Sequence, residues 1–290
     1  MNKGYILELC NVTKRYPKSD FSLNNVSFGL PYGAIMGFVG ENGAGKTTTI
    51  GCILNALKID GGSIKLFGEK LTDEAIHIRE QIGVVFDASI FSGCLTPDKI
   101  GNIMANTYKR WDYRAYKKYL KRFKLPLEQR LSTFSKGMLM KLALSTAISH
   151  SPKLLILDEV TSGLDPVVRD DILDVFLDFV QEEERSVFLS THITSDLEKV
   201  ADYITFIDNG HILLTAQKDD LIYKYGIIRC KYDQFESIYK EDIIAYRKRD
   251  YHVDILISDK YSLQTKYENL CIDNAKVDDI LLLLIKGERG

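Results

Sequence analysis

The fold of this chain is decided by residues 40–47, which read Gly-Glu-Asn-Gly-Ala-Gly-Lys-Thr. The five residues before them, 35–39, are apolar and predict a short buried strand, and a helix is expected to begin at Lys46. Glycines let the loop between strand and helix curl so that its backbone N–H groups face inward, and the helix N-terminus adds positive potential. The stretch therefore predicts a phosphate-binding loop of the pattern G-x-x-x-x-G-K-[ST].

Each polar side chain of this loop has a predicted role. The Lys46 ammonium is placed to bind the β- and γ-phosphates of ATP, and the Thr47 hydroxyl is placed to bind Mg²⁺. A chance glycine-rich turn is the alternative, but the full pattern between a strand and a helix favours nucleotide binding. The other nucleotide contacts that we expect from the loop are Gly40, Asn42, Gly43, Gly45 and Thr48.

A second polar pair follows the apolar run at residues 154–157, where the chain reads Leu-Leu-Ile-Leu and then Asp158 and Glu159. Buried strands often end in a polar turn, so the pair alone does not identify a site. Downstream of a phosphate-binding loop, however, a carboxylate is needed near Mg²⁺, and Asp158 fits that need. Glu159 is then placed to act as general base on the attacking water.

The alternation of strands and helices predicts an α/β fold with a mainly parallel sheet and an antiparallel β portion at the N-terminus. A helical subdomain, about residues 92–150, is inserted in this core, with a helix starting at Thr96-Pro97 and Pro126 separating two halves. We assign residues 1–216 to the main domain and 217–290 to a small α+β accessory region that ends in an apolar helix. The predicted strands are 5–10, 23–28, 35–39, 64–67, 82–86, 154–157, 187–190 and 203–207, and further helices are 46–57, 165–182, 195–200 and 275–286.

Taken in order, the motifs form a set. After the loop come Phe-Ser-Lys-Gly-Met at 134–138, then the acidic strand end, then Ser-Gly-Leu-Asp-Pro at 162–166, and finally Ser-Thr-His at 190–192. Over about residues 5–215 this closely resembles the ATPase subunits of ABC transporters, which have a P-loop NTPase core. The resemblance implies that two subunits sandwich ATP, and that each subunit completes the other's site.

Several roles follow from the resemblance alone. Ser135 and Gly137 correspond to the segment that contacts the γ-phosphate held by the opposite subunit, and Asp165 to a loop that communicates across the dimer. His192 corresponds to a histidine that contacts the γ-phosphate. Tyr16 fits the aromatic residue that stacks on adenine, although an ordinary surface tyrosine is the alternative.

The chain also departs from the family pattern. Phe134, Lys136 and Met138 differ from the usual Leu-Ser-Gly-Gly-Gln, and Asp87 stands where the family has a glutamine that touches Mg²⁺. A carboxylate at that place is a candidate metal ligand, but it adds negative charge beside a triphosphate. We therefore also consider that Asp87 serves coupling to a membrane partner.

Composition limits the remaining possibilities. The net charge of −2 gives no support to a nucleic-acid partner, and the five scattered cysteines give no metal-ligand pair or disulfide framework. The longest apolar run, residues 280–285, is far shorter than the ~20 residues that span a bilayer, so we expect a separate transmembrane permease subunit and a place on the cytoplasmic face of the membrane. We expect a dimer with a second copy or a homologous ATPase subunit.

Some alternatives stay open at this level. Residues 108–124 are basic and aromatic, which suits a buried helical stripe of Trp111, Ala115, Tyr119 and Phe123, or charge near a membrane. The tail helix fits core or dimer packing, or lipid binding. A soluble ABC ATPase and a catalytically weak regulatory subunit are the rival functions. The separate-cassette layout resembles bacterial exporters of peptides, antibiotics or lipids, and Ile-Gly-Val-Val-Phe-Asp-Ala-Ser-Ile-Phe-Ser at 82–92 resembles exporters of phenol-soluble-modulin-like peptides.

Overall fold

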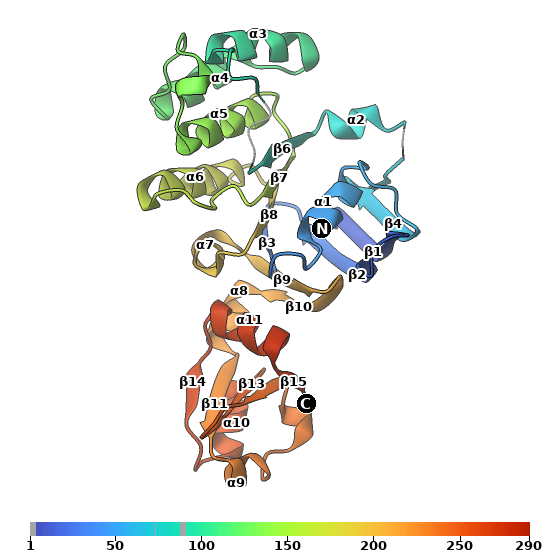
Figure 1. Cartoon of the computed structure of the whole chain (residues 1–290), viewed down its shortest axis with the longest axis vertical. Coiled ribbons are helices and arrows are strands. Elements are labelled where there is room, and N and C mark those ends of the chain that lie inside the picture. Colours follow the sequence, from blue (N-terminus) through green and yellow to red (C-terminus); the bar gives the residue numbers. More distant parts are fainter. Residues whose placement is uncertain (1–3, 73, 88–90) are drawn as a thin grey trace.

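The computed structural model describes residues 4–72, 74–87 and 91–290 (Figure 1). Residues 88–90, within the stretch that resembles the peptide exporters, lie outside the described residues. The chain begins with a four-stranded antiparallel sheet in the order β2-β1-β4-β5. Its strands are β1 (Tyr5–Arg15), β2 (Ser22–Pro31), β4 (Gly61–Leu66) and β5 (Glu69–Lys70). This is the antiparallel portion that the sequence predicts at the N-terminus.

The central sheet has six strands in the order β10-β9-β3-β8-β7-β6. All neighbours pair in parallel except β10, which pairs antiparallel with β9. The prediction of a mainly parallel sheet is therefore confirmed. The strands are β3 (Ile35–Val39), β6 (Ile82–Phe86), β7 (Leu154–Asp158), β8 (Ser186–Thr191), β9 (Tyr203–Asp208) and β10 (His211–Gln217).

Both faces of this sheet are covered, which explains why β3 is apolar throughout and β7 is apolar at every position before Asp158. Alternate residues of β7 belong to different cores: Leu155 and Leu157 face one core, and Leu154 and Ile156 face the other. The first core includes α5 (Lys136–Ile148), α6 (Pro166–Phe179) and α7 (Thr194–Val200). The second includes α1 (Lys46–Ile53), the short α2 (Ile76–Arg79) and the N-terminal sheet.

The helix after the phosphate-binding loop is shorter than predicted. It ends at Ile53 rather than near residue 57. Asn55 adopts a left-handed conformation with φ of 55°, and the N–H groups of Ala56 and Leu57 turn back to the carbonyl of Gly51. A left-handed residue of this kind stops a helix, and asparagine tolerates the conformation better than most side chains.

The segment between β6 and β7 contains three helices, two before Pro126 and one after it, so Pro126 separates two parts as predicted, and Figure 1 shows the helices grouped at one end of the molecule. Thr96 caps the first of them by accepting a hydrogen bond from the Lys99 N–H at 3.4 Å, as the Thr-Pro signal predicts. The helices are α3 (Pro97–Thr107), α4 (Tyr113–Arg122) and α5, and the 3₁₀ turn η1 (Leu131–Thr133) precedes α5.

The predicted apolar stripe of this segment is partly wrong. Trp111, Ala115 and Tyr119 are only half-buried, whereas Tyr116 and Leu120 are fully buried. The buried face of α4 is therefore centred about one residue further along the chain. Tyr116 donates its hydroxyl to the carbonyl of Pro97, so its polar end is satisfied inside the core.

Residues after β10 form a separate five-stranded antiparallel sheet in the order β14-β11-β13-β12-β15, at the opposite end of the molecule from α3–α5 (Figure 1). Within the described residues no helix is long and apolar enough to cross a membrane. The strands are β11 (Gly226–Cys230), β12 (Ala245–Lys248), β13 (Val253–Ile257), β14 (Ile272–Asn274) and β15 (Glu288–Arg289). The helices are α8 (Lys218–Tyr223), α9 (Tyr232–Phe235), η2 (Lys240–Asp242), α10 (Lys260–Lys266) and α11 (Val277–Lys286).

Helix α11 joins this sheet to the main core. Ile280, Leu283 and Leu284 are buried in the same cluster as the α7 residues Leu197 and Val200, so the expectation of core packing is confirmed. Polar contacts fix the junction in both directions: the Thr194 hydroxyl of α7 donates to Asp278 at 2.5 Å, and the Val277 N–H donates to Glu198 at 3.1 Å. The second bond supplies a partner for one of the free N–H groups at the start of α11.

We predict that Ile280→Ala lowers the free energy of unfolding by about 3 kcal/mol, because it removes buried methylene groups and leaves a cavity. Leu282→Ala is the matched control on the same helix, since Leu282 is 41% exposed. The measurement is the urea midpoint of the full chain. Equal midpoints for the two variants would show that α11 does not pack as described.

Candidate nucleotide site

The phosphate-binding loop lies at the carboxyl edge of the central sheet, between β3 and α1. Gly45 has φ of 113°, a conformation that side chains rarely adopt, and a Cβ at this position would come within 2.9 Å of Leu23 and 3.0 Å of Phe21. A Cβ on Gly40 would lie 2.2 Å from the carbonyl oxygen of Ile207. Only glycine fits at these two positions, which explains their place in the motif.

Lys46 is buried in this loop and is surrounded by oxygen atoms. Its Nζ donates to the carbonyls of Gly40 at 2.7 Å and Glu41 at 3.2 Å, and lies 3.3 Å from Glu159 Oε1. A buried ammonium is stable only when it is paired and hydrogen-bonded. The ammonium is thereby held within the curl of the loop.

Asp158 and Thr47 meet at the end of β7. The Thr47 hydroxyl donates to Asp158 Oδ2 at 3.1 Å, while the other oxygen, Oδ1, is buried without a hydrogen-bond partner. Buried polar atoms are rarely left unpaired, and hard oxygen donors of this type suit Mg²⁺. The pair therefore fits a metal ion. Among the described residues no group of three or more His, Cys, Asp or Glu side chains gathers as a metal site.

Glu159 links two motifs that are far apart in the sequence. Its Oε2 lies 2.6 Å from His192 Nδ1, and its Oε1 is the atom near Lys46. Its backbone has a left-handed φ of 55°, which is uncommon for a residue with a long side chain and is typical of residues held in place for function. The two residues lie on the loops that follow neighbouring parallel strands, β7 and β8.

Phe21 lies against the loop, because a Cβ on Gly45 would come within 3.0 Å of its ring, and Tyr16 lies beside Phe21. The Tyr16 and Phe21 rings are 6.4 Å apart, and the Lys14 ammonium lies 5.7 Å from the centre of the Tyr16 ring. Phe21 was not predicted, and its only signal in the sequence is an aromatic residue directly before β2. It lines the shallow pocket over the loop together with Asn42, Gly43, Gly45, Lys46, Thr47, Thr48 and Glu159.

The residues assigned to the facing subunit lie at helix N-termini. Ser135 caps α5 by accepting from the Met138 N–H at 3.2 Å, and Asp165 caps α6 by accepting from the Val168 N–H at 3.0 Å. Gly137 is buried, and a Cβ there would lie 3.0 Å from Val168. Among the described residues, no hydrogen bond or ion pair joins these three to the phosphate-binding loop.

Asp87 follows β6 and is half-exposed. Its carboxylate forms an ion pair with Lys136 at 2.5 Å, and among the described residues no hydrogen bond joins it to Thr47, which donates to Asp158 instead. Sequence reasoning singled out both residues as departures from the family pattern but did not pair them.

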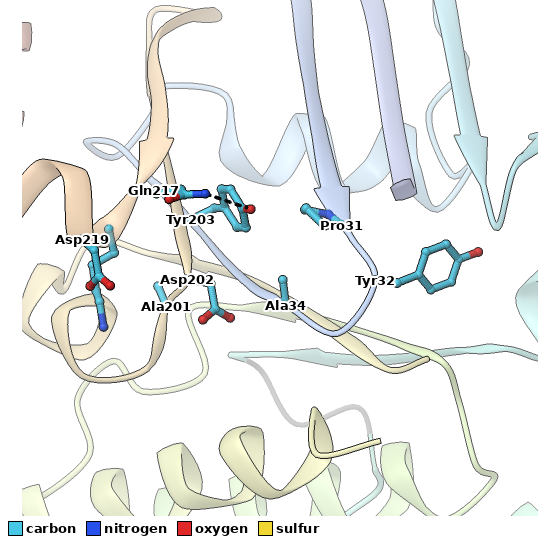
Figure 2. A pocket seen from close by; sticks show the side chains of 9 residues that line it. Pro31, Tyr32, Ala34, Ala201, Asp202, Tyr203, Gln217 and Asp219 are labelled. Carbon is cyan, nitrogen blue, oxygen red and sulfur yellow. Dashed lines mark hydrogen bonds between the residues drawn. The ribbon is translucent and has the colours of Figure 1, made fainter. Parts of the chain in front are cut away.

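Another pocket lies at the opposite edge of the central sheet, where β3 and β9 begin (Figure 2). Three of its polar side chains are engaged in the fold: Asp202 accepts from the Ile35 N–H at 2.8 Å, and Gln217 donates to the Tyr203 hydroxyl at 3.4 Å, which Figure 2 shows as a dashed line. No glycine-rich loop lies there, and ligands of open α/β sheets bind at the carboxyl ends of the strands. The nucleotide site is therefore assigned to the loop at residues 40–47.

Comparison with known proteins agrees with this geometry. Residues 23–162 match the ABC transporter family. The bacitracin transport ATP-binding protein BcrA of Bacillus licheniformis is 33% identical over 74% of this chain and 71% of its own length. BcrA of Enterococcus faecalis is 31% identical over 72% and 68%. A solved ATP-binding subunit of an ABC transporter superposes with a TM-score of 0.65 at 27% identity, over 74% of this chain and 91% of that one. This chain therefore belongs to the ABC transporter family, as an ATP-binding and ATP-hydrolysing subunit.

Proposed function

We propose that this subunit powers the export of peptide-like antibiotics or amphipathic peptides through a separate permease. The observation that carries the ATPase part is the cluster of Lys46, Glu159 and His192 beside the Thr47–Asp158 pair. The cargo class rests on the similarity to two bacitracin transport proteins. That similarity also favours a transporter subunit over a soluble ABC ATPase.

Binding of the nucleotide follows from the loop. The inward N–H groups and the Lys46 ammonium hold the phosphates, while the Tyr16 ring, with Phe21 beside it, offers a flat apolar face to adenine. Bound Mg²⁺ neutralises phosphate charge and polarises the bond that is cleaved. Thr47 and Asp158 are the residues that would hold it, since the Asp158 carboxylate has one buried oxygen without a partner beside the Thr47 hydroxyl.

Hydrolysis requires a general base for the attacking water and a side chain that contacts the γ-phosphate. Glu159 is the base: a carboxylate at the end of β7 accepts the proton of the attacking water. His192 lies against the second oxygen of Glu159 at 2.6 Å, so it fixes the orientation of the carboxylate and is itself held at the edge of the site. Lys46 contributes the positive charge on the other side of Glu159.

The site is completed by a second subunit. Ser135 and Gly137 lie at the N-terminus of α5, and Asp165 lies at the N-terminus of α6. The first N–H groups of a helix have no partner within the helix, so these two N-termini and the Ser135 hydroxyl can donate to an anion. Two chains facing each other would place these groups on the γ-phosphate of the partner. A homodimer is the simplest assembly, and a homologous ATPase subunit is the alternative partner.

The permease is proposed to dock in the apolar groove between β6, α3 and α5, at the cytoplasmic face of the membrane. The rings of Tyr108 and His150 stack at 4.1 Å in its wall, and burial lowers the pKa of His150 below its ordinary value. Phe86 also lines it and directly precedes Asp87. A permease helix bound in this groove would therefore contact the end of β6, the strand that lies beside β7 and the nucleotide site. The other lining residues are Val84, Val85, Phe91, Met104, Ala143, Thr146 and Ala147.

We predict that Lys46→Ala abolishes ATP turnover, because the phosphates lose the buried ammonium. Phosphate release by the full chain is the measurement. Lys65→Ala, which removes an exposed ammonium from β4, is the control and should leave turnover unchanged. Hydrolysis by Lys46→Ala within a few-fold of the unchanged chain would disprove the assignment of the loop.

We predict that Glu159→Gln retains ATP binding and nearly stops hydrolysis, since a neutral amide cannot take the proton of water. The closed dimer should then accumulate with ATP and appear as a doubled mass by light scattering. Full activity of this variant would place the general base elsewhere, and His192 would be the next residue to test.

We predict that Gly137→Asp prevents the ATP-dependent dimer in the Glu159→Gln background. The new side chain adds bulk at a position where even a Cβ would lie 3.0 Å from Val168, and it adds negative charge where a phosphate has to approach. MgATP binding by the single chain is the folding control and should persist. A normal dimer in this variant would contradict the facing arrangement.

A further inference from the structure

An ion pair joins the inserted helices to the central sheet at the edge of the nucleotide site. Lys136 Nζ lies 2.5 Å from Asp87 Oδ1, and the two side chains are 46% and 50% exposed. Asp87 directly follows β6, and Lys136 is the first residue of α5. The pair therefore adds a polar link between the end of β6 and the start of α5, two elements that also pack against each other.

The position of Asp87 brings it near other negative charges. Phe86 pairs with Asp158 in the parallel register of β6 and β7, so Asp87 and Glu159 leave the same sheet edge on adjacent strands. Like charges close together destabilise one another. Glu159 has Lys46 and His192 as partners, and Asp87 has Lys136.

The position of Lys136 is also unfavourable for its positive charge when no carboxylate is paired with it. It occupies the first turn of α5, where the exposed N–H groups create positive potential that disfavours a cation. A carboxylate beside it offsets that potential. The Lys136 ammonium also lies over the loop before α6, because a Cβ on Gly163 would be 3.6 Å from Nζ. Two charges that are each poorly placed alone thus stabilise one another.

We propose that Lys136 is a positioning residue, which holds the Asp87 carboxylate away from the Thr47–Asp158 metal site and fixes the first turn of α5 to the core. This inference rests on the proposed function, because it places the metal and the triphosphate at that site. When the pair is intact, Asp87 adds no unpaired negative charge beside the phosphates. Ser135 and Gly137, the neighbours of Lys136 in the sequence, then keep a defined orientation toward the facing subunit.

The test is a double-mutant cycle on MgATP binding by the full chain. Lys136→Gln leaves Asp87 without a partner, and we expect it to weaken MgATP binding about fivefold, the upper end for a half-exposed ion pair. Adding Asp87→Asn to Lys136→Gln removes the repulsive charge and should restore binding to within about twofold of Asp87→Asn alone. Lys136→Arg keeps the pair and should bind like the unchanged chain. Isothermal titration at low and high salt is the measurement, and the loss in Lys136→Gln should shrink at high salt.

Arg122→Gln is the matched control. Arg122 pairs with Asp178 at 2.6 Å and is 39% exposed, and this pair joins α4 to α6 rather than to the loop after β6. It should leave MgATP binding unchanged at both salt concentrations.

Two results would overturn the inference. One is an equal loss for Lys136→Gln with and without Asp87→Asn, which would show that the two residues act independently. The other is weaker MgATP binding by Asp87→Asn alone, with a loss that depends on the Mg²⁺ concentration, which would make Asp87 a metal ligand. A failure of the proposed function would look different from both results. In that case the unchanged chain would bind MgATP no more tightly than the Lys46→Ala variant does.

Discussion

The buried ammonium of Lys46 is the charge around which the carboxyl edge of the sheet is organised. A cation inside a protein needs nearby oxygen atoms, and here two backbone carbonyls and Glu159 supply them. The carbonyls come from the loop itself, and the carboxylate comes from the neighbouring loop after β7. Because Glu159 also contacts His192, one cation connects the ends of β3, β7 and β8.

The parallel sheet makes this convergence possible. Strands β3, β8, β7 and β6 run in the same direction side by side, so the loops that follow them emerge at one edge. Most of their side chains are buried on both faces, which places the polar side chains of the site at the carboxyl ends of the strands and in the loops that follow. The apolar strands therefore act as a rigid base, and the charged residues at their ends gain fixed positions.

The C-terminal region is packed onto the same core and close to the same edge. Helix α7 begins at Thr194, two positions after His192, and α11 contacts α7 through a hydroxyl, a backbone N–H and a shared apolar cluster. Lys286 at the end of α11 also lies 3.8 Å from Glu41 in the phosphate-binding loop. The accessory region is thus in physical contact with two elements of the nucleotide site, which its composition alone did not indicate.

The sequence by itself determined the features that rest on neighbouring residues: the glycine loop, the acidic end of β7, the Thr96 cap and most strands of the first two sheets, though not β5 or β10. Each depends on local backbone conformation or on a short apolar period, which a contiguous stretch specifies. It was less successful where the chain meets other elements, as in the early end of α1 at Asn55 and the buried face of α4. Only the tertiary structure decided which distant polar side chains pair: Glu159 with His192, Asp87 with Lys136, Thr194 with Asp278. Such pairs form between residues distant in sequence, and their geometry depends on how the sheet and helices pack.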